Sequence, residues 1–337
     1  MIEIRNVTKR FGSLVAVNDL SLEIGAGEVF GFIGPNGAGK STTMKILACL
    51  LAPDAGTAKV GGLDVTSDGD RIRQILGYMP DFLGVYDDLT VDEYLQFFAA
   101  AFRIHRRKRG QIIDSVLELT DLVEKKKAMV SSLSRGMQQR LGVARVLIHE
   151  PKVLLLDEPA SGLDPRARIE MRSLLQELAR MGKSLMVSSH ILSELAEMCT
   201  TIGIIERGKL LYAGSIQEAY ARTRPGEQIE VRLESPAAAG GANGSDTPAD
   251  GAGDGNVIDP DVLERARAAL EGDARVHAVA VVASPRAALQ VSLVPGEHSH
   301  HFIIERLLGA GLRIAAFTPK EVRLEEAFLK LTTGALQ

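Results

Sequence analysis

The segment that most constrains the fold is a glycine-rich stretch between a predicted strand and a predicted helix. Residues 34–41 read GPNGAGKS, which matches the pattern GxxxxGK[ST]. The stretch follows an apolar run at residues 29–33 and precedes helix-like sequence at residues 42–51. Glycines let such a loop turn its backbone N–H groups inward around phosphate oxygens, in conformations that a Cβ would penalise. The stretch therefore predicts a phosphate-binding loop.

Side chains at the end of this loop add to the expected phosphate site. Lys40 would supply a positive charge to the β and γ phosphates, and Ser41 would offer its hydroxyl to Mg²⁺. The helix that follows would add its N-terminal dipole. The nucleotide-binding residues expected in this segment are Gly34, Pro35, Asn36, Gly37, Ala38, Gly39, Lys40, Ser41 and Thr42.

Two carboxylates end a second apolar run, VLLLDE at residues 153–158. The apolar part predicts a buried strand, and open parallel sheets bind ligands beyond the ends of such strands. Asp157 would hold Mg²⁺, directly or through water, and Glu158 would polarise the attacking water. An acidic strand end before a proline is also ordinary turn chemistry, so this assignment depends on the phosphate-binding loop. Together the two motifs fit kinases, GTPases, helicases and transport ATPases.

Three further segments narrow that choice. They read LSRGMQQRL at residues 133–141, SGLD at residues 161–164 and SSH at residues 188–190. With the loop and the two carboxylates, and in this order, they resemble the nucleotide-binding subunit of ABC transporters over residues 1 to about 222. The corresponding family motifs are the LSGGQ signature, the D-loop and the switch histidine.

The resemblance implies that two copies pack head to tail, with each ATP between the loop of one copy and Ser134 and Gly136 of the other. Phe11 would stack on adenine, where a tyrosine is more usual; a core aromatic at a strand end is the alternative. His190 would contact the γ-phosphate and the water, although a histidine after a strand is often only a hydrogen-bonded polar residue. The expected catalytic residues are Glu158, His190 and Lys40.

Two positions depart from the family pattern. Residues 77–81 read GYMPD, where a run like GYLPQ is usual. Asp81 keeps an oxygen ligand, so we expect it still to serve Mg²⁺; the alternative is an exposed turn residue after Pro80. Arg135 replaces the first glycine of the signature, and the sequence leaves open whether it points to solvent or adds charge at the interface. The expected metal-binding residues are Ser41, Asp157 and Asp81.

The composition changes sharply at residues 235–256, which contain no aromatic or large aliphatic residue and predict a disordered loop. Around this loop the order β-α-β-β-α-β predicts a small split βαβ sandwich, with a last helix at residues 324–331. The expected fold is therefore α/β: a P-loop NTPase of the ABC ATPase type with a helical signature subdomain at residues 1–222, and an α+β accessory domain at residues 223–337.

The ending LEEAFLKLT resembles the type-2 exporter branch, in which a single-domain ATPase pairs with a separately encoded permease. By this resemblance the segment after Asp81 forms a groove for a cytoplasmic permease helix. The alternative for its apolar residues is local core packing. The residues apolar enough for the permease contact are Phe82, Leu83, Val85 and Tyr86.

Charge and hydropathy limit the partners. The net charge of −4 gives no positive field for a dedicated nucleic-acid binder, so no specific nucleic acid is expected. No apolar run approaches the roughly 18 residues of a membrane span, so any membrane role should be peripheral. The family resemblance implies a place on the cytoplasmic face of the membrane. The function that fits is the ATP-hydrolysing motor subunit of an ABC exporter, a homodimer that uses ATP and Mg²⁺. The alternative is a soluble ABC ATPase that acts on translation or DNA.

Overall fold

The computed structural model describes most of the chain and divides it into two compact units. The described residues are 1–82, 84, 88–192, 195, 198–223, 228–234, 260–282, 288–294, 297 and 299–320. Those up to Ala219 form the first unit, and those from Tyr220 onwards form the second. The predicted loop at residues 235–256 and the predicted helix at residues 324–331 lie outside the described residues.

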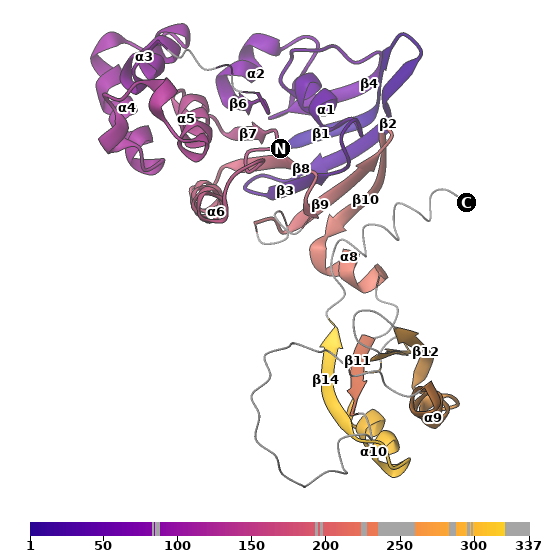
Figure 1. The fold of residues 1–337 in the computed structure, drawn as a ribbon. Helices are drawn as coiled ribbons and strands as arrows, with labels where there is room; N and C mark the ends of the chain where they lie inside the picture. The colour runs from indigo at the N-terminus through magenta and orange to yellow at the C-terminus, as the bar shows by residue number, and fades with distance from the viewer. Residues whose placement is uncertain are drawn as a thin grey trace, which may run out of the picture. The chain divides into compact units, whose positions relative to one another are not determined.

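Among the described residues, the first unit is built on a six-stranded sheet in the order β10-β9-β3-β8-β7-β6 (Figure 1). The strands from β9 to β6 are parallel, and β10 is antiparallel to β9. All residues of β3, β7 and β8 are buried, as expected for strands covered on both faces. The bounds are Val29–Ile33 (β3), Leu76–Met79 (β6), Val153–Leu156 (β7), Ser184–Ser189 (β8), Thr201–Glu206 (β9) and Lys209–Ser215 (β10).

A second, antiparallel sheet in the order β2-β1-β4-β5 packs against the first around helix α1. One apolar cluster contains Ile4 and Leu20 of this sheet, Met44 of α1, and Phe30 and Leu155 of the main sheet. The sequence analysis did not predict this sheet, because its pairing joins segments that are distant along the chain. The bounds are Ile2–Phe11 (β1), Leu14–Ile24 (β2), Ala55–Val60 (β4), Leu63–Asp64 (β5) and Lys40–Leu47 (α1).

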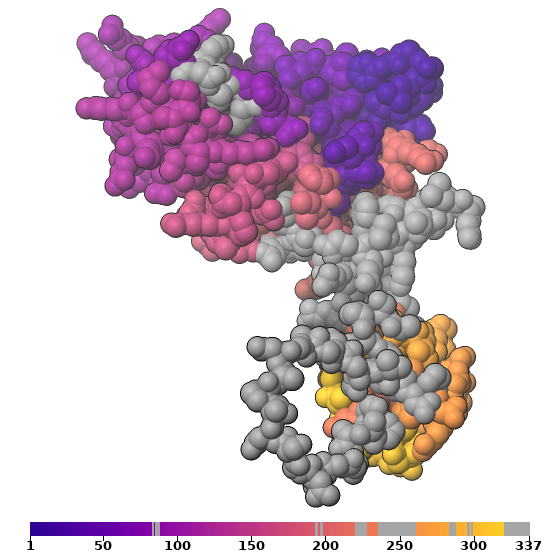
Figure 2. Space-filling view, in the orientation of Figure 1, coloured from indigo at the N-terminus to yellow at the C-terminus, as the bar shows by residue number. Residues whose placement is uncertain are grey.

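Helices α3, α4 and α5 form a lobe at one end of the first unit, visible in purple and magenta in Figure 2. Helix α5 begins after Ser134, whose hydroxyl accepts a hydrogen bond from the Met137 N–H, and α6 begins with a proline after the cap residue Asp164. No helix in the described ranges combines the length and the apolar character that crossing a membrane requires. The bounds are Gly69–Ile75 (α2), Val91–Ala101 (α3), Arg106–Leu119 (α4), Arg135–Leu147 (α5) and Pro165–Arg180 (α6).

The second unit contains an antiparallel sheet in the order β12-β13-β11-β14, with α9 and α10 packed on it. Its element order, β-α-β-β-α-β, confirms the predicted split βαβ arrangement. Its core contains Val231, Leu263, Val291 and Ile303. The bounds are Gln228–Leu233 (β11), Pro260–Leu270 (α9), Val276–Val282 (β12), Ala288–Leu293 (β13), His301–Gly309 (α10) and Ile314–Lys320 (β14); α8 spans Ile216–Thr223.

Candidate functional site

The glycine-rich loop joins the end of β3 to the start of α1. Gly39 has φ 109°, and a Cβ there would lie 2.4 Å from the Ala16 carbonyl oxygen, so only glycine fits. The loop is fastened from outside, because the Gly208 N–H donates to the Ala38 carbonyl at 2.9 Å and the Asn18 N–H donates to the Gly208 carbonyl at 2.9 Å. No side chain caps α1, so the N–H groups of its first turn remain available to an anion.

Lys40 lies between this loop and Glu158. Its ammonium group donates to the Gly34 carbonyl at 2.6 Å and to the Pro35 carbonyl at 3.3 Å. The same nitrogen is 3.3 Å from Oε1 of Glu158, an ion pair that lacks the alignment of a hydrogen bond. Only 6% of Lys40 is exposed, so its charge is held at the inner side of the loop.

Asp157 and Glu158 follow β7, and both are buried, at 2% and 8% exposed. A single hydroxyl on the neighbouring strand β8 joins them. Ser188 Oγ donates to Oδ1 of Asp157 at 2.5 Å and accepts from the Glu158 N–H at 2.9 Å. Glu158 has φ 51°, an uncommon backbone conformation for a residue with a side chain. The sequence analysis noticed the SSH segment only for its histidine; finding Ser188 would have required the pairing of β8 with β7.

His190 contacts the second oxygen of the same carboxylate. Its Nδ1 lies 2.9 Å from Oε2 of Glu158, and 40% of its side chain is exposed. The three expected catalytic residues are therefore brought together, with Glu158 between Lys40 and His190. One side of this group is buried and the histidine side is open to solvent. The arrangement provides a hydrogen-bond acceptor for a water molecule next to a positively charged phosphate-binding loop.

Asp81 brings a third carboxyl group to this end of the sheet. Asp81 is exposed, yet partial desolvation of its carboxyl group raises its pKa. The charges of Asp157 and Glu158 raise this pKa further, while Arg135 and His190 act in the opposite direction. The Asp157 N–H donates to the carbonyl of Met79, the last residue of β6, at 2.9 Å, which holds the two strand ends side by side.

Burial raises the pKa of Tyr78 as well, with smaller effects from Asp157 and Asp81. Its hydroxyl is buried and has no hydrogen-bond partner among the described residues. Acidic and phenolic oxygens thus converge on the carboxyl ends of β6 and β7.

The donor set suits Mg²⁺ held jointly with phosphate. Among the described residues no group of three or more His, Cys, Asp or Glu side chains is arranged to hold a metal alone. Mg²⁺ commonly takes only one or two carboxylates and completes its shell with substrate phosphates and water. Asp157 and Asp81 supply negative charge, and Ser41, in the first turn of α1, supplies a hydroxyl beside the phosphate-binding loop. These residues fit the metal.

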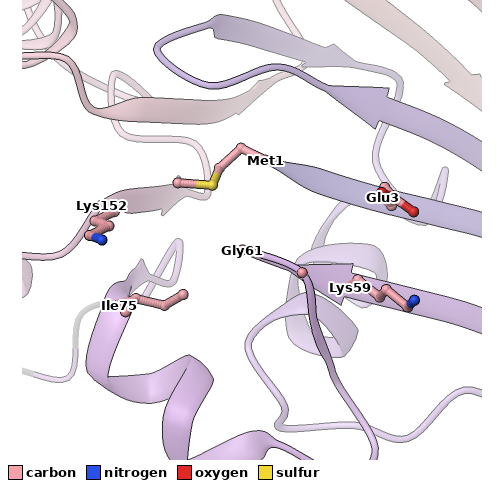
Figure 3. Close-up of a pocket in the computed structure, with 7 residues that line it drawn as sticks. Met1, Glu3, Lys59, Gly61, Ile75 and Lys152 are labelled. Carbon is pink, nitrogen blue, oxygen red and sulfur yellow. The ribbon is translucent and has the colours of Figure 1, made fainter.

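A separate hollow of about 220 Å³ is lined by Met1, Glu3, Lys59, Gly61, Gly62, Ile75 and Lys152 (Figure 3). Lys152 immediately precedes β7, so the hollow lies near the amino end of that strand. The glycine-rich loop follows the carboxyl end of the parallel strand β3. The hollow is therefore distinct from the site around Glu158.

Comparisons with known proteins place this geometry in a family. A family model described as ABC transporter matches residues 17–161. Nod factor export ATP-binding protein I of Burkholderia orbicola is 38% identical over 237 residues, which are 70% of this chain and 78% of that protein. The chain belongs to the ABC transporter family.

Other ABC relatives and structures agree. Probable multidrug ABC transporter ATP-binding protein YbhF of Escherichia coli is 37% identical over 69% of this chain, and the match spans only 40% of that protein's length. Bacitracin transport ATP-binding protein BcrA of Bacillus licheniformis is 39% identical over 63% of this chain and 68% of that protein. A dimeric ATP-binding cassette bound to ADP and Pi is 25% identical, with a TM-score of 0.58 over 64% of this chain and 99% of that chain. The first unit therefore has the P-loop fold of ABC ATPases.

The remaining residues predicted from the ABC pattern lie on other surfaces. Phe11 ends β1 and is 50% exposed, with the Lys9 ammonium 5.7 Å from the ring centroid, so it is not a core aromatic. Phe82 is 86% exposed, so core packing does not hold for this residue either. Leu83, Val85 and Tyr86, also expected at the permease contact, lie outside the described residues.

The ABC signature forms the start of α5. The described contacts of Ser134 and Gly136 are with Met137 and Ala167, in their own helix and in α6, rather than with the glycine-rich loop. Arg135 folds onto Gly162 of the SGLD turn: a Cβ on this glycine would lie 2.5 Å from the guanidinium carbon. Arg135 remains exposed while its guanidinium lies against Gly162 of the same chain. Whether it also adds charge at an interface stays a prediction.

Replacing Ser188 by alanine should weaken the first unit. The change leaves the buried Glu158 N–H and one oxygen of Asp157 without their shared partner. We expect the free energy of unfolding to fall by about 1–3 kcal/mol, as for an unsatisfied buried polar group. Urea unfolding followed by circular dichroism measures this change. The matched control is Ser173→Ala on the exposed face of α6, which should cost about 0.5 kcal/mol or less. Equal stability of the two variants would contradict the bridging role.

Proposed function

We propose that this chain is the ATP-hydrolysing motor subunit of an ABC exporter, an ABC-type transport ATPase. The observation that carries the proposal is the position of Glu158, whose two carboxylate oxygens face Lys40 and His190 beside the glycine-rich loop. Relatives named for multidrug transport, Nod factor export and bacitracin transport support the choice of transport, and of export in particular. The ATP-binding domain would comprise residues 1–222, and residues 223–337 would form an accessory domain.

The loop would hold ATP through backbone N–H groups of residues 34–42 and the Lys40 ammonium. The α1 N-terminus adds a favourable dipole for the same phosphates. Phe11 presents a half-exposed ring, suitable for stacking on the adenine base. These groups fix the nucleotide before any chemistry, which is the main contribution that a protein makes to phosphoryl transfer.

Asp157, Ser41 and Asp81 would hold the Mg²⁺ that accompanies ATP, directly or through water. When bound, the metal neutralises charge on the phosphate oxygens. Ser188 orients Asp157 through its hydroxyl, so the metal-facing carboxylate is fixed by a hydrogen bond from outside the metal shell.

Glu158 would accept a hydrogen bond from the attacking water and orient it toward the γ-phosphate. His190, 2.9 Å from Oε2, fixes the carboxylate from the solvent side and is placed to contact the γ-phosphate and the water. Lys40 anchors the other oxygen and offers its charge to the phosphates. The residues proposed as catalytic are thus Glu158, His190 and Lys40.

Two copies would associate head to tail, with Ser134 and Gly136 of one copy against the phosphates bound by the other. The contacts of Ser134 and Gly136 lie within α5 and with α6. These contacts support a role at a second surface rather than at the glycine-rich loop of the same chain. The likeness to a dimeric cassette bound to ADP and Pi supports the formation of a dimer. Hydrolysis would then require a homodimer, and phosphate release would let it open.

Replacing Glu158 by glutamine should separate binding from hydrolysis. The amide keeps the size of the side chain but is a much poorer proton acceptor, so we expect the ATPase rate to fall about 100-fold or more with nucleotide affinity retained. Phosphate release and fluorescent-nucleotide binding measure the two quantities. Glu177→Gln, an exposed carboxylate paired with Arg180 on α6, is the matched control and should hydrolyse ATP at the parent rate. Turnover at the parent rate in Glu158→Gln would remove Glu158 from the mechanism.

Asp81 offers a test of the metal site. Asp81→Gln restores the residue usual in the family and removes one negative charge near Asp157 and Glu158. We expect a several-fold change in the Mg²⁺ concentration needed for half-maximal ATPase activity, and a parallel change in Mn²⁺ binding followed by electron paramagnetic resonance. Unchanged dependence in both measurements would assign Asp81 to the turn after Pro80 alone.

The chain would work at the cytoplasmic face of the membrane, bound to an integral-membrane permease through the surface around Phe82. An 86% exposed phenylalanine is a suitable contact for an apolar helix face. Substrate selectivity would belong to the permease, while the first unit supplies the phosphate chemistry.

A tagged Glu158→Gln chain, solubilised from host membranes in mild detergent with Mg-ATP, tests this partnership. We expect a stoichiometric multi-span membrane protein to copurify, and its recovery to drop at least several-fold with Phe82→Ser added. Leu50→Ser, at a residue 62% exposed, is the matched control and should not affect recovery. Recovery only from the soluble fraction, with ribosomes or nucleic acid, would favour the soluble ABC ATPase instead.

A further inference from the structure

Arg135 lies at the exposed start of α5, yet its side chain packs on the backbone of another loop. A Cβ built on Gly162 would be 2.5 Å from the guanidinium carbon and 2.6 and 2.7 Å from its two terminal nitrogens. These nearly equal distances mean that the planar group lies flat against the glycine. A Cβ at position 162 would therefore overlap the guanidinium group of Arg135 in its present position.

Gly162 sits at the tip of a turn that is anchored at both ends. At one end the Ser161 N–H donates to the Glu158 carbonyl at 3.1 Å. At the other, Asp164 caps α6 by accepting from the Ala167 N–H at 2.8 Å. Gly162 itself has φ 67°, the left-handed region that favours glycine. The Ser161 hydrogen bond therefore connects the tip of the turn directly to the backbone of Glu158.

The starts of α5 and α6 are closely packed beside this turn. A Cβ on Gly136 would lie only 2.8 Å from the Cβ of Ala167. Further along, the buried Arg140 of α5 lies 3.6 Å from Glu170 of α6. The two helix starts therefore form a firm base, and Arg135 extends from that base over the turn.

We propose that Arg135 is a positioning residue that clamps the turn of residues 161–164 to the start of α5, and so links Ser134 to Glu158 within one chain. The clamp itself is a property of the single chain. Its consequence rests on the proposed function: if Glu158 orients the attacking water, the clamp keeps the turn that follows Glu158 in the position that catalysis needs.

Arg135 also lies within electrostatic reach of Asp81, which follows the carboxyl end of β6. The arginine is therefore close to this strand end as well as to the turn. The two departures from the family pattern, an added negative charge at position 81 and an added positive charge at position 135, offset each other.

Hydrogen–deuterium exchange on the full-length chain tests the clamp without any ATPase measurement. In Arg135→Gly, the amides of Ser161 and Leu163, both hydrogen-bonded within the turn, should exchange at least about five-fold faster than in the parent. The matched control is Arg106→Gly, the same change at the first residue of α4, which should leave them at the parent rate. Parent-like exchange in Arg135→Gly would overturn the clamp.

A double-mutant cycle tests whether the contact is direct. Gly162→Ala places a Cβ in the space of the guanidinium and also strains the left-handed backbone. In the Arg135→Gly background only the backbone strain remains, so the added alanine should speed exchange less than it does in the parent. Equal effects in both backgrounds would show that the two residues act independently, and would overturn the proposal.

Kinetics test the link to Glu158. Arg135→Gly should lower kcat several-fold, with the nucleotide affinity of the Glu158→Gln background unchanged. Arg135→Lys, which keeps the charge without the planar group, should recover only part of the loss. Faster exchange in Arg135→Gly with parent kinetics would overturn the positioning role. If the parent chain itself has no ATPase activity, the proposed function is refuted, and the exchange result alone decides whether the clamp exists.

Discussion

Burial of two carboxylates at the end of β7 is the constraint on which the rest of the first unit depends. Removing an ionised group from water costs several kcal/mol unless charge and hydrogen bonds compensate for it. Here Ser188 bridges Asp157 and Glu158, and Lys40 and His190 face the two oxygens of Glu158. Ser188 and His190 come from the end of β8, and Lys40 comes from the start of α1, after the loop that follows β3. The strand order that places β8 between β3 and β7 is what brings them together.

The burial of these carboxylates also explains why charged side chains from other segments lie near Glu158. Lys40 is a buried cation 3.3 Å from Glu158, while Asp81 adds a third acidic group at the neighbouring strand end. A charge of opposite sign is supplied by Arg135 from the start of α5. The extra negative charge of Asp81 is thus offset by the positive charge of Arg135, although the two positions are far apart in the sequence.

The sequence was most informative where short-range patterns decide the structure. The glycine-rich loop, the apolar strand before Asp157 and the element order of the second unit all follow from local signals. The antiparallel sheet of β1, β2, β4 and β5 depends on long-range pairing, which no local pattern specifies. The bridging role of Ser188 and the direction of the Arg135 side chain depend on which neighbours the completed fold provides.

Because Gly208 supports the glycine-rich loop, the loop can reach its final structure only after residue 208 has been synthesised. Gly208 holds this loop by donating to Ala38, and it also accepts from Asn18 in the antiparallel sheet. A growing polypeptide that has not yet reached the turn between β9 and β10 contains every letter of GPNGAGKS but lacks the outer wall of the loop. During translation, the phosphate-binding loop is therefore completed only after Gly208 has been synthesised, although its own residues emerge from the ribosome well before Gly208.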